Sequence, residues 1–116
     1  EDLSKSYFPL ATMEMDCEAG ILHGAANLYA YLVPYIGGTA YQMTRYRVGV
    51  FVDGILVAET DNITEEIHST SLPYSIAVPT KTIQIECRVK IMQGIVVAND
   101  AFQTYVGQLW ARNGRA

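Results

Sequence analysis

Residues 82–92 alternate between apolar and polar side chains without interruption. The apolar positions of this segment are Ile83, Ile85, Cys87, Val89 and Ile91. Because successive side chains of a strand point to opposite faces, the segment is predicted to be a strand with one face in a core and the other in water. We expect that core to include Val48 and Val50 from a second strand.

The same kind of alternation recurs along the rest of the chain. Further strands are predicted over residues 12–18, 27–35, 41–52, 55–59, 74–78, 95–98 and 101–110. Residues 61–71 are polar and are predicted to form a loop, with one helical turn at 64–67, and residues 112–116 a polar tail. About eight strands with turn signals every 8–12 residues or so are typical of an all-β, antiparallel β-sandwich, jelly-roll or immunoglobulin-like.

The strand at 41–52 is joined to the strand at 55–59 by Asp53 and Gly54 alone. A two-residue Asp-Gly loop favours a type I′ turn, because both residues tolerate a positive φ angle. The sequence therefore predicts a tight hairpin here. This hairpin is the most specific local signal in the chain.

Residues 1–11 show no clear period. Tyr7, Phe8 and Leu10 flank Pro9 in this segment, which suggests an extended arm that docks by its apolar side chains. We therefore expect an N-terminal arm over residues 1–11 and a single β-sandwich domain over residues 12–116. At 116 residues the chain is long enough for one domain with a proper core.

The predicted strand at 27–35 is apolar on both faces. Leu28, Ala30 and Leu32 point one way, and the opposite face carries Tyr29, Tyr31, Val33 and Tyr35. A strand of this kind is either covered on both sides or contributes to an interface. Two interpretations stay open: the N-terminal arm covers the tyrosine face, or a second subunit does. On the second, Tyr29, Tyr31, Val33 and Tyr35 form an oligomer interface, and Tyr31→Ala weakens the oligomer.

Composition excludes several classes of partner. The chain has a net charge of −4 and its few basic residues are scattered, which argues against nucleic acid as a partner. No apolar run approaches the roughly 20 residues of a spanning helix, so no membrane span is predicted.

Eight tyrosines against three phenylalanines favour an interface protein. The chain begins at Glu1 and shows no signal-peptide pattern, so we expect a fragment or a processed product.

The two cysteines, Cys17 and Cys87, both fall on apolar strand faces. We expect two buried thiols rather than a disulfide across the core. An apolar setting disfavours the thiolate, so Cys87 is a poor candidate nucleophile. His23 and His68 are placed in different loops without metal-ligand spacing, so no metal site is predicted.

The remaining candidates for chemistry are weak. Asp61 with Glu65 and Glu66 matches no calcium loop and is better explained as a solvated acidic segment. Asp16 and Glu86 are expected to be surface charges. No Gly-x-Ser-x-Gly turn activates the hydroxyls at 69–71, and the sequon at Asn62 matters only in a secreted protein. No catalytic residue and no cofactor are predicted.

Strand pairing is suggested by charge. The outward face of residues 12–18 is acidic, through Glu14, Asp16 and Glu18. Opposite charges on facing strands are favourable, so this strand is expected beside the basic face of Arg88 and Lys90, or that of 45–47.

The hairpin and the strands that follow it carry a resemblance to a known class. The run 46–60, Tyr-Arg-Val-Gly-Val-Phe-Val-Asp-Gly-Ile-Leu-Val-Ala-Glu-Thr, followed by residues 75–79 and 81–90, resembles small β-sandwich domains of bacteriophage virion proteins. Tail fibres, appendages and head-decoration proteins carry hairpin patterns of this kind. The resemblance covers residues 41–112. It implies a non-enzymatic structural component of a virus particle, a homo-oligomer and commonly a trimer, with other virion proteins as partners, a location in the virion and a role in attachment.

An adhesion or binding module of the immunoglobulin or fibronectin kind, on a cell surface or secreted, is the alternative. Against it, the single tryptophan, Trp110, falls near the end of the chain and not on an early strand. A stable multimer is expected of the first class and a monomer of the second. Nothing in the sequence favours a small enzyme.

Overall fold

The computed structural model describes residues 7–32, 35–36, 39–40, 45–61, 63, 67–93 and 102–114, and these contain strands and no helix. Four strands form one antiparallel sheet in the order β1-β8-β5-β6, and three form a second in the order β7-β2-β9. The pair β3 and β4 stands apart from both sheets. The strands are β1 Tyr7–Cys17, β2 Gly20–Leu32, β3 Tyr35–Ile36, β4 Thr39–Ala40, β5 Arg45–Val52, β6 Ile55–Glu59, β7 Ile67–Val78, β8 Lys81–Gln93 and β9 Phe102–Gly114.

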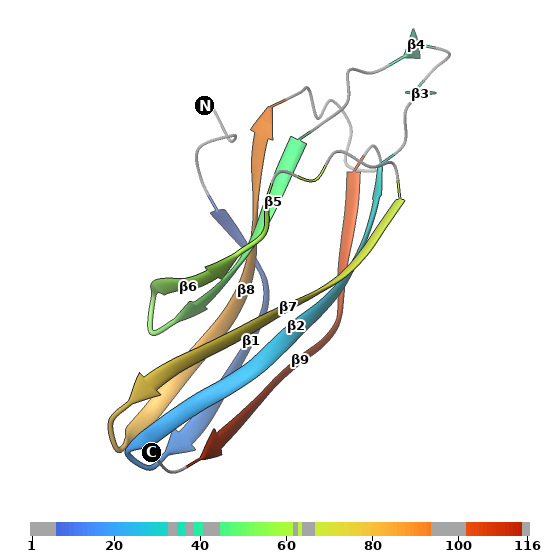
Figure 1. Cartoon of the computed structure of the whole chain (residues 1–116). Coiled ribbons are helices and arrows are strands. Elements are labelled where there is room, and N and C mark those ends of the chain that lie inside the picture. The colour runs from blue at the N-terminus through green and yellow to red at the C-terminus, as the bar shows by residue number, and fades with distance from the viewer. Residues whose placement is uncertain are drawn as a thin grey trace.

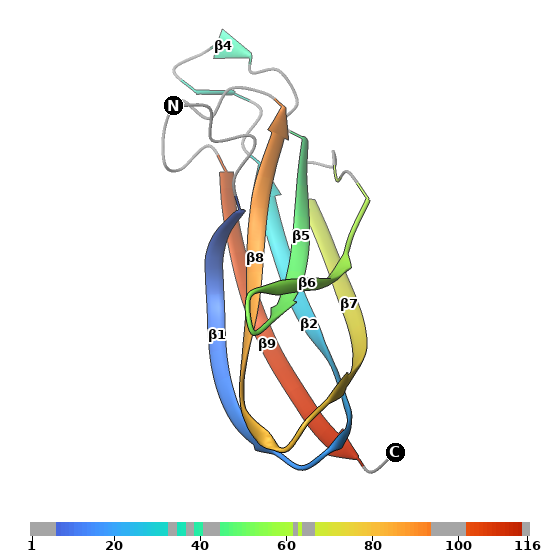
Figure 2. The same ribbon diagram turned by 90° about the vertical axis from the view of Figure 1, so that its left-hand side faces the viewer.

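The two sheets face each other and share one hydrophobic core (Figures 1 and 2). Val89 pairs with Val48 and Cys87 with Val50 between β8 and β5, and all four side chains are buried, as is Ile85. The core predicted from the alternation of residues 82–92 is therefore confirmed. The facing sheet adds apolar side chains at every second position of β2 and β7, such as Leu22, Ala26, Leu28, Leu72 and Tyr74.

The predicted Asp-Gly hairpin between β5 and β6 is confirmed. Asp53 has a φ of 49° and Gly54 a φ of 81°, the positive pair that a type I′ turn requires. The turn is also fixed to β8: the Asp53 amide donates to the Gln84 carbonyl, and the Gln84 amide donates to the Asp53 carboxylate at 2.9 Å. That hydrogen bond, together with Lys81, lowers the pKa of Asp53.

Replacing Gly54 by valine is expected to lower the free energy of unfolding by about 2 kcal/mol, because a β-branched residue is strained at positive φ. A Cβ atom at Gly54 meets no heavy atom within 4 Å, so the whole effect is backbone strain. Gly54→Asn is the matched control, since asparagine tolerates this region, and it should cost far less. Urea denaturation measures both. Equal losses for the two variants would show that the turn does not hold residue 54 at positive φ.

Several predicted boundaries are wrong, and pairing explains each. Residues Tyr7–Ala11 are not a separate arm, because β1 begins at Tyr7 and pairs with β8 from there. The segment from Ile67 to Ser71 is strand, not loop, because β7 follows β2 along its whole length. Likewise β9 runs to Gly114 along β2, so the tail prediction fails there. The predicted strand at 95–98 lies outside the described residues. So do residues 64–66 of the helical turn predicted over 64–67, and its last residue, Ile67, opens strand β7.

The strand count and the charge pairing also need correction. Seven strands of the described chain form the two sheets, and β3 and β4 form a separate pair, so the predicted single set of about eight is not confirmed. The acidic strand β1 does lie beside β8, as expected. Its register, however, sets Glu14 opposite Gln84 and Asp16 opposite Thr82, while Arg88 faces Pro9. The strands therefore pair through their backbones and apolar faces, not through opposed charges.

Candidate functional site

The two sheets expose outer faces of very different character. On the outer face of β1-β8-β5, the charged side chains among the described residues include Glu14, Asp16, Arg47, Glu86, Arg88 and Lys90. Several of them pair with one another, as Arg47 does with Glu59 at 3.3 Å and Arg88 with Glu86 at 2.5 Å. The same sheet also exposes two large apolar side chains, Ile55 and Leu56, on its edge strand β6.

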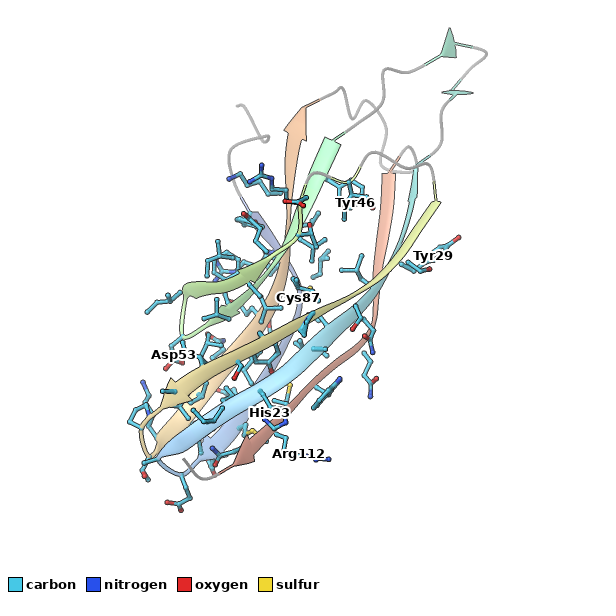
Figure 3. All side chains as sticks on the ribbon, viewed as in Figure 1. His23, Tyr29, Tyr46, Asp53, Cys87 and Arg112 are labelled. Carbon is cyan, nitrogen blue, oxygen red and sulfur yellow. The ribbon has the colours of Figure 1, made fainter. Side chains whose placement is uncertain are left out.

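The outer face of β7-β2-β9 is almost free of charge, and we call it the aromatic face. Register places its described residues in rows: Ile21, His23, Ala25, Asn27 and Tyr29 from β2; Ser69, Ser71, Pro73, Ser75 and Ala77 from β7; Gln108, Trp110 and Arg112 from β9. Of these, Arg112 alone carries a permanent charge. Among the side chains that the structure describes on this face, the exposed large aromatic ones are Tyr29, 40% exposed, and Trp110, 36% exposed. Figure 3 shows Tyr29 pointing away from the other sheet.

The four predicted interface residues are placed differently. Tyr29 is exposed on the aromatic face while its neighbour Leu28 is 4% exposed in the core, so the predicted orientation of this strand is confirmed there. Tyr31 belongs to β2, opposite Gln103 and Ile67, but its side chain is outside the described residues, as is Val33 entirely.

Tyr35 does not continue β2. The strand predicted over 27–35 ends at Leu32, and Tyr35 opens β3, which pairs with β4. The sequence gives a reason, because Pro34 has no backbone N–H to offer a ladder. The structure therefore does not bring Tyr35 onto the strand that carries Tyr29 and Tyr31.

An open hollow of about 410 Å³ lies on the aromatic face beside Tyr29. Asn27, Leu28, Tyr29, Ser69, Ser71 and Gly107 line it. Its origin is local. The β7 residues opposite Asn27 and Tyr29 are small serines, and Gly107 is the extra residue of a bulge where the β2–β9 register shifts. Most of the surface that the hollow exposes is apolar.

Trp110 stands on the same face, one strand across from Ala25, and it was not predicted as a site residue. Its ring packs edge-to-face against His23, with centroids 6.1 Å apart. Its backbone is held by a hydrogen bond from the buried Tyr74, whose hydroxyl donates to the Trp110 carbonyl at 3.0 Å. The Tyr74 side chain passes over Gly24 to reach it. Burial raises the pKa of Tyr74 to about 12, so this donor keeps its proton. The sequence around Trp110 does not indicate that it lies on the aromatic face. Its strand register, which pairs it with Ala25, shows this.

The edge strands of both sheets carry features that discourage pairing with another strand. Among the edge strands, β1 has Pro9 and a bulge, β6 is a five-residue strand with a bulge, β7 contains Pro73, and β9 has its bulge at Gly107. Proline, bulges and short length are the devices by which sheets avoid edge-to-edge association. Association is therefore favoured through a face and not through an edge.

The other candidates for chemistry are structural. Cys17 and Cys87 are free and buried, as predicted, and burial raises the pKa of Cys87 to about 11, which disfavours the reactive thiolate. His23 and His68 lie in strands β2 and β7, not in loops. Within the described residues no group of three His, Cys, Asp or Glu side chains could hold a metal ion.

A second aromatic cluster, on the charged face, is fully engaged within the chain. Tyr7 packs edge-to-face on Phe51 at 5.0 Å, and the Arg88 guanidinium lies 4.1 Å from the centre of the Phe51 ring. The Tyr7 hydroxyl donates to Glu59, and burial with this contact raises the pKa of Tyr7. The cluster holds β1 to β5 and β6 and presents little free surface.

No model of a known protein family matches the chain, and no curated protein matches it either. In the described part of the chain, no helix is long and apolar enough to cross a membrane.

Proposed function

We propose that the chain is a non-enzymatic structural component of a virus particle, of the phage capsid-decoration or tail-appendage class, and that it assembles through the aromatic face. The observation that carries the proposal is the nearly uncharged outer surface of β7-β2-β9, with Tyr29 and Trp110 exposed on it. Depletion of charge with exposed aromatic side chains is the compositional mark of an interface core. In the proposal other copies of the chain are the first partners, and other virion proteins follow.

The contrast between the two faces supports assembly over simple surface variation. The outer face of β1-β8-β5 carries charges of both signs. Solubility therefore gives no reason for the outer face of β7-β2-β9 to be nearly uncharged. A nearly uncharged face with two exposed aromatic side chains is more typical of an interface than of a free surface. The prolines, bulges and short length of the edge strands disfavour edge-to-edge pairing, which is consistent with face-to-face assembly.

We class the fold as a β-sandwich, and the strand order bears on the alternative function. Counting the seven strands of the two sheets, the second pairs with the fifth and the third with the sixth, as in an immunoglobulin constant domain. Three strands differ: β1 lies beside the sixth strand, β9 beside the second and β6 beside the third. The immunoglobulin order places the first strand beside the second, the last beside the sixth and the fourth beside the fifth. The eight strands of a jelly roll are likewise absent from the two described sheets.

The shared central pairs favour the second candidate function, an extracellular adhesion or binding module. On that proposal the aromatic face would bind a different protein, and the chain alone would be a monomer. Molecular mass in solution separates the two functions.

The proposed assembly predicts the effect of Tyr29→Ala. We expect truncation of this aromatic side chain to cost about 1.4 kcal/mol of association free energy, which weakens association by about tenfold. The matched control is Ile55→Ala, because Ile55 is 65% exposed on the other sheet and belongs to no part of the aromatic face. Analytical ultracentrifugation at micromolar concentration measures both variants beside the wild type. A wild-type chain that sediments as a monomer would remove the proposal.

A further inference from the structure

An exposed aromatic side chain and an open, mostly apolar hollow lie on the same face of this molecule. Trp110 of β9 pairs with Ala25 of β2, and the hollow is lined by residues 27–29 of the same strand β2. Three residues of strand span about 10 Å, so Trp110 and the hollow are close neighbours. A volume of about 410 Å³ falls within the range of pockets that bind small molecules, which is ample for an indole ring.

We propose that two copies of the chain pack their aromatic faces together about a twofold axis, with Trp110 of each copy inserted into the hollow of the other. This inference rests on the proposed function and names its primary contact. A twofold interface brings the same patch of both subunits together, so it must be complementary to itself. The exposed Trp110 and the hollow beside Tyr29 are set apart along the direction of β2, so they meet that requirement when the β2 strands of the two copies run in opposite directions.

The chemistry of the hollow favours this occupant. Its surface is mostly apolar, and Ser69, Ser71 and Asn27 are its polar residues. The Asn27 amide already donates to the Gln108 side chain at 3.1 Å, so the two serine hydroxyls are the main polar groups that the hollow offers. An indole suits such a site because it brings a large apolar area with one N–H donor, and the serine hydroxyls accept such a donor.

Charge also fits a second copy. Arg112 is the one permanent charge among the described residues of the aromatic face, and it lies opposite His23, next to the row of Trp110 and away from the hollow. A face of this kind meets its own image without like charges gathered at the centre. Because two face-to-face sheets lie about 10 Å apart, contact depends on large exposed side chains such as Trp110.

The single tryptophan of the chain makes the contact directly observable. Tryptophan emission moves to shorter wavelength when the ring leaves water, so the emission of Trp110 should shift to the red on dilution, in step with dissociation. The midpoint of this shift should match the dissociation constant found by sedimentation. Association with no change in emission would overturn the proposed contact.

A pair of variants tests the insertion itself. Trp110→Ala removes the indole ring and keeps the hollow. Ser71→Phe fills the hollow and keeps the indole ring. Each alone should self-associate at least about 30-fold more weakly than the wild type, the effect of losing a central aromatic contact. Mixed together, the two should associate more tightly than either alone, because one intact insertion is restored, and the emission should shift to the blue. Circular dichroism checks that each variant is folded.

The outcomes separate this inference from the proposed function. A chain that self-associates, but whose variants bind as the wild type does or fail to complement each other, would overturn the insertion and leave face-to-face assembly standing. A wild-type trimer would overturn the twofold arrangement. A monomeric wild type would remove both proposals.

Discussion

Gly24→Ala is expected to lower the free energy of unfolding by about 3 kcal/mol or more, one of the two largest effects that the structure predicts. A Cβ atom at Gly24 would lie 1.9 Å from the Trp110 carbonyl oxygen and 2.8 Å from the Tyr74 hydroxyl. The carbonyl belongs to the backbone of β9, so it cannot move away without separating β9 from β2. The substitution would therefore weaken strand pairing and the hydrogen bond from Tyr74 together.

Gly114→Ala is the matched control for this prediction. Gly114 lies in the same three-stranded sheet, and a Cβ atom there meets no heavy atom within 4 Å. Its effect should stay within about 0.5 kcal/mol, as for an ordinary surface substitution. Urea denaturation followed by circular dichroism compares the two. A Gly24→Ala variant that unfolds at the wild-type urea concentration would contradict the close crossing of Tyr74 over β2.

Val89→Asp is expected to leave the domain unfolded at neutral pH. Val89 is 4% exposed and packs in the core that the two sheets share. An isolated carboxylate in such a place costs several kcal/mol, which is a large part of the total stability of a small domain. Thermal unfolding followed by circular dichroism measures the loss.

Ile55→Asp controls for the introduced charge itself, since Ile55 is 65% exposed on β6 and lies outside the aromatic face. Its melting temperature should remain near that of the wild type. A folded Val89→Asp variant that melts with the wild type would show that the inward face of β8 is assigned wrongly.

The sequence predicted correctly where a local rule decides the structure. Alternation at residues 82–92 determined which side chains of β8 enter the core, since a strand has a strict period of two. The Asp53-Gly54 turn followed from backbone conformations that few residue pairs adopt. The opposite orientations of Leu28 and Tyr29 followed from the same period.

Features that depend on a partner strand could not be read from the sequence. The small polar residues at 68–71 form strand because β2 supplies a partner for them, although their own composition is typical of a loop. The same pairing extended β9 beyond Trp110. The candidate site itself depends on register, since nothing local to Trp110 or Ser71 indicates that they share a face with Tyr29.

The central claim is that the aromatic face is the surface of assembly, and sedimentation velocity of two lysine variants tests it most directly. Ser75→Lys adds a charge to the aromatic face on edge strand β7, and Thr12→Lys adds the same charge to the opposite outer face on edge strand β1. Burying an unpaired lysine charge between two aromatic faces costs free energy, whereas a lysine that stays in water does not. At micromolar concentration we predict an associated wild type, an equally associated Thr12→Lys variant and a monomeric Ser75→Lys variant. A monomeric wild type, or two lysine variants that sediment alike, would contradict the claim.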